Sequence, residues 1–473
     1  MTLTQIAIFG LFSLAVGWLK QPRGRGLLLL GASLLAIFWL QPATPIRNLD
    51  FWFPTTSIFF TILVWMITRE KASHQASGWL LQVTPVVGIL LILALTRYLG
   101  PLCCLTATRP PVIQQVLAVL LILMTILTLT QSIHRPSLLA GIALFLLIAI
   151  FIILKTDTLA QTLSGILRQI EGQDASLAAA IDLRWLGFSY LAFRLLHVLR
   201  DFQLGKAHNF SLSEFTIYTL FFPTLTAGPI DRSQRFMSDL RSSPALTSGA
   251  LLDGGKRILL GVFKKFVLAD SLAIISLSPQ NAPQVTSSGW LWALLYAYSF
   301  RIYFDFSGYT DIALGLGRWM GFRLPENFTA PYLKTNLTAF WNSWHITLAQ
   351  WFRAYFFNPV TRALRSSSLQ LTVWLIILAG QAGTMLLIGL WHGVTWNFAA
   401  WGLWHAAGLF IHNRWSEWLR PRLSGVEERP GLFLALKLAS WLLTFHYITL
   451  GWVWFALPDL SLSLHVIKKL FGL

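Results

Sequence analysis

The chain has 473 residues, of which 55% are hydrophobic and only 12% charged, and its formal net charge is +17. So little charge cannot cover the surface of a soluble protein of this length, which excludes the soluble globular class. A basic balance can indicate nucleic-acid binding. Here, however, Lys and Arg flank apolar segments and form no basic domain, as in the loops of membrane proteins, so we expect no nucleic-acid partner.

Apolar segments long enough to cross the hydrocarbon core of a bilayer as helices recur along the whole chain. We place them near 4–19, 26–41, 51–68, 79–97, 113–132, 137–154, 178–198, 212–228, 251–277, 288–304, 371–391, 394–413 and 432–456. They predict an all-α polytopic membrane protein with about 11–13 transmembrane or re-entrant helices. We treat residues 1–473 as a single integral membrane domain in contact with the lipid bilayer.

Basic residues around the first segments predict their orientation. No positive charge precedes the first segment, whereas Lys20, Arg23 and Arg25 follow it, and Arg69 and Lys71 follow the third. Since basic loops stay in the cytoplasm, we expect an uncleaved first span with its N-terminus outside.

The two parts of the chain differ in how many polar and aromatic residues interrupt their apolar segments. Residues 1–180 are mostly simple apolar spans and predict a scaffold. Residues 181–456 place polar and aromatic side chains inside apolar surroundings. Polar groups in hydrocarbon are costly unless they are paired or line a cavity, so we expect the functional site in this second part.

The stretch "YFDFSGYTDIALGLGRWMGFRLPENF" (303–328) holds Asp305, Asp311 and Arg318. Asp311 and Arg318, seven residues apart, share a helix face, so we favour a buried ion pair between them. Asp305 and Asp311 could instead form an acid/base pair, but six residues place them on different faces. Three glycines would let other helices approach closely: Gly308, Gly315 and Gly317.

The stretch "FWNSWHITLAQWFRAYFFNPV" (340–360) predicts a short amphipathic helix that ends at Pro359. On a helical wheel the apolar face gathers Trp341, Trp344, Leu348, Trp351, Phe352 and Tyr355, and the polar face Asn342, Ser343, Thr347, Gln350 and Arg353. His345 falls between the two faces. There it could contact an apolar substrate and water together, or simply bond to a backbone carbonyl.

A second histidine, His392, lies in "IGLWHGVTWNF" (388–398), with Gly389 and Gly393 beside it and no charge nearby. Such flanks predict a packed site in which burial keeps the imidazole neutral. A neutral imidazole can act as a general base, although a structural histidine bridging two helices is the alternative. His405 and His412 share one face of the next helix, but no Cys, Asp or Glu lies close in sequence, so we expect no metal.

A histidine base without a G-x-S-x-G elbow, a Walker loop or a metal fits transfer of an acyl group from a thioester to a hydroxyl. The thioester is already activated, so the enzyme must accept the hydroxyl proton and stabilise an oxyanion with neutral donors. Candidate donors are Asn342, Asn397 and indole N–H groups.

Four stretches together resemble the membrane-bound O-acyltransferase (MBOAT) family, over roughly residues 187–454. They are 221–236, 303–328, 341–360 and "GLWHGVTWNFAAWGLWHAAGL" (389–409). The similarity is greatest to the bacterial branch with the alginate O-acetylation and teichoic-acid D-alanyl transfer membrane proteins. This pattern usually has a basic pair where this chain has Asn342 and Ser343, and an acid at Ala354.

The resemblance implies a ring of helices around a tunnel, with His392 as the catalytic histidine and His345 as the second motif histidine. Further substrate-binding candidates are Asn342, Trp344, Arg353, Trp391, Asn397 and Asp305, although for Asp305, as for Asp311, we favour an architectural role. The donor would be an acyl-CoA or an acyl group on a carrier protein's phosphopantetheine, used as a substrate with no bound cofactor. The acceptor would be an extracytoplasmic polysaccharide or cell-wall polymer.

The partner implied is an acyl carrier protein or a polysaccharide-acylating protein, and the location is the inner (plasma) membrane. The alternatives are a lipid O-acyltransferase and a non-catalytic transporter of acyl groups or glycans.

Overall fold

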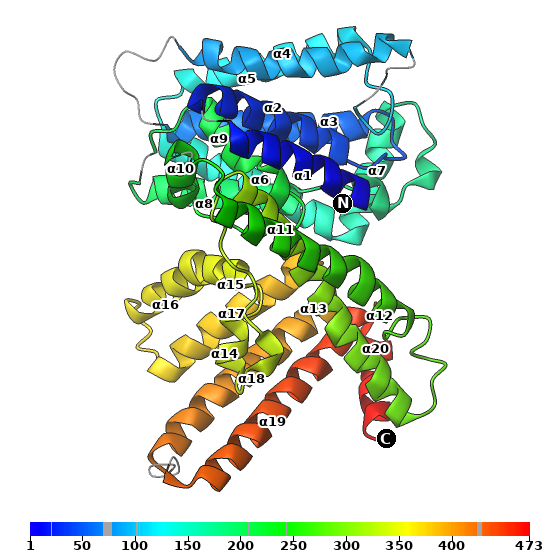
Figure 1. The fold of residues 1–473 in the computed structure, drawn as a ribbon, viewed down its shortest axis with the longest axis vertical. Helices are drawn as coiled ribbons and strands as arrows, with labels where there is room; N and C mark the ends of the chain where they lie inside the picture. The colour runs from blue at the N-terminus through cyan, green and yellow to red at the C-terminus, as the bar shows by residue number, and fades with distance from the viewer. Residues whose placement is uncertain are drawn as a thin grey trace. The chain divides into compact units, whose positions relative to one another are not determined.

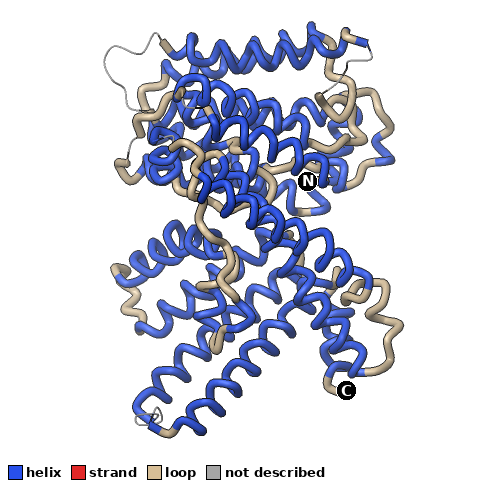
Figure 2. Tube along the Cα trace, in the orientation of Figure 1, coloured by secondary structure: helices blue, strands red, loops and turns tan. Residues whose placement is uncertain are grey.

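The computed structural model describes residues 1–19, 21–69, 78–100, 103, 105–206, 208–242, 244–422 and 428–473. Across these ranges the chain forms helices and loops and no β-strand, apart from isolated single bridges (Figure 2). The all-α class predicted from the sequence is confirmed. Lys20 and Lys71, which entered the orientation argument, lie outside the described residues.

The chain divides into two compact units, which we call unit 1 (residues 1–258 and 313–324) and unit 2 (259–312 and 325–473). This division differs from the expected boundary near residue 180. The single membrane domain remains a prediction.

The helices follow one another along the chain as Figure 1 labels them. Those from the N-terminal half are α1 (Leu3–Trp18), α2 (Pro22–Leu40), α3 (Leu49–Thr68), α4 (Trp79–Leu95), α5 (Ile113–Ser132), α6 (Pro136–Lys155), α7 (Asp157–Ile170), α8 (Phe188–Gln203), α9 (Leu212–Thr219), α10 (Ser233–Ser242) and α11 (Ser248–Val262). The others are α12 (Asp270–Ile274), α13 (Ser288–Trp319), α14 (Leu337–Trp341), α15 (Ile346–Phe352), α16 (Asn358–Arg365), α17 (Val373–His392), α18 (Trp396–Leu419), α19 (Pro430–Ala456) and α20 (Leu460–Leu470).

Seven helices of the described chain are long and apolar enough to cross a membrane, namely α2, α3, α4, α5, α6, α17 and α19. A multi-pass membrane protein follows. Three predicted segments are shorter or interrupted. The segment predicted over 178–198 starts only at Phe188, after Gly187, whose backbone is left-handed (φ 75°). The segment predicted over 212–228 stops at Thr219, before Pro223, which cannot continue a helix. The segment predicted over 251–277 contains a π-helical stretch, Phe263–Ala269.

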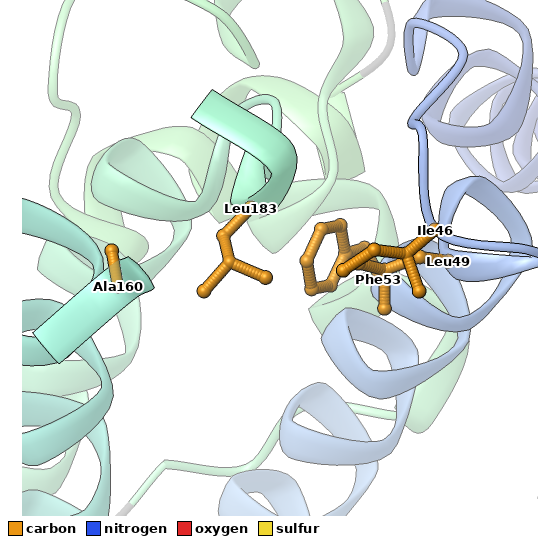
Figure 3. Close-up of a cluster of buried hydrophobic side chains, with 5 residues drawn as sticks. All are labelled: Ile46, Leu49, Phe53, Ala160 and Leu183. Carbon is orange, nitrogen blue, oxygen red and sulfur yellow. The ribbon is translucent and has the colours of Figure 1, made fainter. Parts of the chain in front are cut away.

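Unit 1 is organised around α3, which is 78% buried, whereas α5 and α6 are each 17% buried and leave their sides open to lipid. Within α3, the ring of Phe53 stacks on that of Trp185, with 4.6 Å between the ring centroids. Figure 3 shows the adjoining apolar cluster of Ile46, Leu49, Phe53, Ala160 and Leu183. Arg25, which we counted as a loop charge, is instead buried. It donates to the carbonyl oxygens of Met320 and Pro244, because a buried guanidinium needs acceptors.

In unit 2, α17 and α18 form a helical hairpin (Figure 1). Glycines allow the close approach. A Cβ on Gly389 would collide with the carbonyl oxygen of Phe398, and one on Gly402 would lie 2.5 Å from the carbonyl oxygen of Met385. The tight packing expected around Gly389 is therefore present, and it fixes the end of α17 where His392 lies.

Candidate active site

His345 lies in a turn and not inside a continuous helix. The predicted helix over 340–360 is interrupted after Trp341, and His345 has a left-handed backbone (φ 44°, ψ 52°) just before α15. The helical wheel is therefore wrong from Trp341 to His345. Pro359 does not end the helix either: the helical backbone runs without a break from α15 through a π-helical turn (Arg353–Phe357) into α16, and Pro359 lies inside this run.

Asn327 holds this turn in place. Its side-chain oxygen accepts from the backbone N–H of Thr347 at 3.2 Å and from the Thr347 hydroxyl at 2.7 Å, and its carbonyl accepts from Ile346 N–H at 3.0 Å. One isolated antiparallel bridge joins Phe328 to Trp344. The end of the 303–328 stretch thus fixes the start of α15. The sequence-based reasoning gave Asn327 no role.

The His345 imidazole is buried, being 3% exposed. Its ring meets Phe306 edge-on at 4.7 Å and Trp391 at 6.0 Å between centroids. Neither ring nitrogen has a hydrogen-bond partner among the residues the structure describes. Burial lowers the pKa of the His345 imidazole, so the ring is neutral at pH 7. It does not lie at a boundary with water, as one of the two interpretations expected.

His392 is the last residue of α17 and is half-buried, which differs from the full burial that its apolar flanks predicted. Four aromatic rings surround it: Trp391 at 4.5 Å, Phe455 at 4.7 Å, Trp401 at 5.7 Å and Phe398 at 5.8 Å between centroids. The indole of Trp391 therefore contacts both His345 and His392. Tertiary structure brings two histidines 47 residues apart in sequence to one side chain.

A family model described as membrane-bound O-acyltransferase matches residues 138–451, which is more than half of the chain and includes both histidines. The chain belongs to the membrane-bound O-acyltransferase (MBOAT) family. All four stretches that carried the resemblance lie within the matched range.

Relatives of this MBOAT chain carry related names. The Teichoic acid D-alanyltransferase of Streptococcus thermophilus is 36% identical over 49% of this chain and 58% of its own length. The Probable alginate O-acetylase AlgI of Pseudomonas aeruginosa is 35% identical over 61% and 51%. The Peptidoglycan O-acetyltransferase of Helicobacter pylori is 34% identical over 56% and 48%. The chain spans about half the length of these relatives.

The first family stretch (221–236) lies in unit 1 and is held by Arg194 of α8. The guanidinium donates to the carbonyl oxygens of Tyr218 and Thr219 at the end of α9, at 3.1 and 2.8 Å, and to that of Thr224 within the stretch, at 3.0 Å. Further along, Asp231 forms an ion pair with Arg235. These contacts satisfy the backbone of an irregular segment, so a structural role accounts for these polar residues.

Two expected substrate-binding residues face outward. Asn342 and Arg353 are both exposed, and the Arg353 guanidinium donates to the Asn342 side-chain oxygen at 2.8 Å. Trp344 is buried instead, with its ring 5.1 Å from Trp452. Of these three candidate residues, Asn342 and Arg353 therefore form an exposed polar pair, whereas Trp344 belongs to the buried aromatic interior.

Asn397 is buried and its amide nitrogen is already engaged. It donates to the carbonyl oxygens of Leu457 and Asp459 at 2.8 and 3.1 Å and approaches the Ser463 hydroxyl at 2.8 Å. The side chain ties the start of α18 to the α19–α20 connection. This geometry does not favour Asn397 as an oxyanion donor.

Asp305 and Asp311 pair with adjacent lysines on the π-helical stretch. Lys264 lies 2.7 Å from buried Asp311, and Lys265 contacts Asp305, whose side chain is 53% exposed. The expected Asp311–Arg318 pair is wrong. Arg318 lies 3.7 Å from Asp253, because the neighbouring helix supplies the closer charges. Gly308 permits this approach, since a Cβ there would lie 2.8 Å from the carbonyl oxygen of Gly261.

The sequence-based reasoning missed His405, which it weighed only as half of a metal pair. The ring is fully buried and lies 4.8 Å from Trp401 and 5.1 Å from Trp341 between centroids. Trp401 is also a neighbour of His392. The available signal was a histidine in the part of α18 that carries no Lys, Arg, Asp or Glu, with Trp404 before it and Ala406 after it.

Proposed function

We propose that this MBOAT protein transfers an acyl group, of the acetyl or D-alanyl type, from a thioester donor to a hydroxyl of an extracytoplasmic polysaccharide or cell-wall polymer. His392 is the general base, and His345 positions the acceptor or donor and shares the proton work. The observation that carries the proposal is the Trp391 indole, which contacts both imidazoles. The names of the relatives give the acyl and acceptor classes.

The proposed reaction needs no covalent enzyme intermediate. The His392 imidazole accepts the proton of the acceptor hydroxyl while the hydroxyl oxygen bonds to the thioester carbonyl carbon. The carbonyl electrons move onto oxygen to give a tetrahedral oxyanion. As they return, the carbon–sulfur bond breaks, and the sulfur leaves with the proton from the imidazolium. The products are an ester and a thiol, and His392 is neutral again.

Indole N–H groups are better oxyanion donors here than the two asparagines. Asn342 is exposed and Asn397 is engaged with the chain after α19. By contrast, the indole nitrogens of Trp341 and Trp401 are buried with no hydrogen-bond partner in the described chain. Neighbouring indoles such as Trp404 and Trp452 do have acceptors. Donors that are desolvated and uncommitted suit a developing negative charge.

Charge supports an anionic donor, either coenzyme A or an acyl carrier protein's phosphopantetheine. The sequence has no Asp or Glu between Glu326 and Glu417, yet it has Lys334, Arg353, Arg362, Arg365 and Arg414. Three of these side chains are exposed on and before α16: Arg353, Arg362 and Arg365. Such a surface attracts phosphate groups or an acidic protein. We place the protein in the inner (plasma) membrane, where a cytoplasmic donor and an external acceptor can meet.

The test is mass spectrometry of cell-envelope polymers from cells with wild-type protein and with His392→Gln, at matched protein amounts. We expect an ester-linked acyl group to fall at least about 100-fold in the variant, since base removal costs 10²–10⁴ in rate. The mass that disappears identifies the acyl group. His446→Gln is the matched control, because His446 bonds to the Tyr296 hydroxyl away from Trp391.

Unchanged esters with folded His392→Gln protein would refute the proposal and favour a transporter. Loss of ester from lipids, with the polymers unchanged, would indicate a lipid O-acyltransferase.

A further inference from the structure

The His405 side chain packs between Trp341, which precedes His345 in sequence, and Trp401, which contacts His392. Its ring meets Trp341 at 87° and Trp401 at 66°, both edge-to-face. Trp341 comes four residues before His345, in the same turn region, and Trp401 contacts the His392 ring at 5.7 Å. The imidazole therefore contacts one neighbour of each proposed catalytic histidine.

The chemistry of this residue is costly for a purely structural one. The His405 side chain is 0% exposed, and neither ring nitrogen has a hydrogen-bond partner among the described residues. Both contacting indoles, Trp341 and Trp401, also have buried N–H groups that find no acceptor there. Phenylalanine would fill a similar space without burying two unpaired polar atoms. A concentration of unsatisfied polar atoms in a native interior calls for a functional explanation.

Helix α19 is shaped to admit this imidazole. A Cβ on Gly451 would lie 2.9 Å from the His405 Nε2 atom and 3.1 Å from the Trp404 ring. The glycine thus sets the depth of the imidazole between the helices. Even one methyl group at position 451 would force the His405 ring to shift and would crowd Trp404.

We propose that His405 is a positioning residue for acyl transfer. Its imidazole sets the orientation of the Trp341 and Trp401 indoles, and through them the spacing of His345 and His392. This role rests on the proposed function. It differs from core packing because it requires an imidazole and not merely a ring of similar size, packed against two indoles whose own N–H groups find no acceptor among the described residues. Activity and stability should therefore respond in opposite ways to removal of the ring nitrogens.

The first variant is His405→Phe, which keeps an aromatic ring and removes the nitrogens. We expect a thermal midpoint equal to or above that of wild type, but at least a tenfold loss of ester-linked acyl groups at matched protein amounts. In permeabilised cells supplied with their own donor and acceptor, the acid limb of the pH–rate profile should also shift, since Trp401 contacts His392. Replacing a residue with a purely structural role would lower the rate by the same factor at every pH and would leave the pH of the acid limb unchanged.

Gly451→Ala perturbs the same ring from another helix. We expect it to lower ester formation about tenfold, and expect the double variant Gly451→Ala with His405→Ala to be no worse than His405→Ala alone. That non-additivity would show that the glycine acts through His405. If His405→Phe fails to accumulate, the Gly451→Ala cycle still decides the question. His446→Phe is the control, with an unchanged profile.

Two results would overturn the inference: wild-type activity and profile in His405→Phe, or additive losses in the Gly451 cycle. The outcome for His392→Gln separates the two proposals. If His392→Gln abolishes ester formation while His405→Phe does not, only the positioning role fails. If His392→Gln has no effect, the acyltransferase proposal itself fails.

Discussion

His345 combines two unfavourable features in one residue. Its backbone is left-handed, which costs a residue with a Cβ roughly 1–2 kcal/mol, and its imidazole is buried without a hydrogen-bond partner in the described chain. Strain of this kind persists where the surroundings over-determine a conformation, and it often marks functional sites. Here Asn327, the α15 start and the contact with Trp391 supply those surroundings.

Burial of His345 predicts a pH-dependent stability. Its folded pKa is lowered from 6.5, so the unfolded state binds the proton more tightly. The folded state therefore has its full stability above pH 6.5 and loses it as pH falls toward the folded pKa, by at most about 1.4 kcal/mol per pH unit. We expect the thermal midpoint of the purified wild-type protein to decrease as the pH is lowered from 7 to 5.

His345→Gln should show a shallower fall over the same range, because it has no group to titrate. His446→Gln serves as the comparison. Equal slopes for wild type and His345→Gln would contradict a buried neutral imidazole at position 345.

The π-helical stretch at 263–269 acts as an element that presents two adjacent lysines to α13. Lys264 and Lys265 are consecutive residues of this stretch, and they pair with two carboxylates that lie six residues apart on α13, Asp311 and Asp305. The two ion pairs differ in burial, since Asp311 is nearly enclosed and Asp305 is half exposed. This difference makes them a natural pair for comparison.

Asp311→Asn should destabilise the protein by about 2–4 kcal/mol, because it leaves Lys264 without its carboxylate in a mostly buried place. Asp305→Asn should change stability by less than about 1 kcal/mol, since exposed pairs contribute little. Denaturation of both variants in detergent measures this. If Asp305→Asn is stable yet loses ester formation, the substrate-binding prediction for Asp305 gains support; equal destabilisation by both would contradict the burial argument.

Arg362 and Arg365 of helix α16 are exposed and lie in a part of the sequence without acidic residues. Reversing both charges, Arg362→Glu with Arg365→Glu, should lower ester formation about tenfold by weakening attraction of an anionic donor. Raising the salt concentration in permeabilised cells should lower wild-type activity and affect the variant less. Arg47→Glu with Arg135→Glu, two exposed arginines outside this region, is the control, and an equal loss there would argue against a local effect.

At the scale of the whole molecule, the proposed chemistry is confined to unit 2. His345, His392, His405 and their aromatic neighbours all belong to it, and the stretch from 327 to 416 that holds them is free of acids. Unit 1 contributes buried spans and the segment at 221–236, to which Arg194 bonds at Thr224. A buried aromatic surrounding without acidic groups strengthens electrostatic interactions with a developing oxyanion and limits water, which would otherwise hydrolyse a thioester.

Composition and apolar periodicity predicted the all-α membrane class and seven of the thirteen expected spans, because a bilayer permits few structures. The family was predicted separately, from the resemblance of four motifs that are local in sequence. The reasoning from apolar patterns also singled out His392 and His345, since an ionisable group among apolar residues is conspicuous. It misjudged the helix at 340–360, since the bonds from Asn327 come from a separate segment.

Only tertiary structure placed Trp391 against both histidines, exchanged the partner of Asp311 and brought His405 between two indoles. Each of these contacts joins side chains from different helices or turns. Periodicity along one helix says which residues share a face, but not what that face meets.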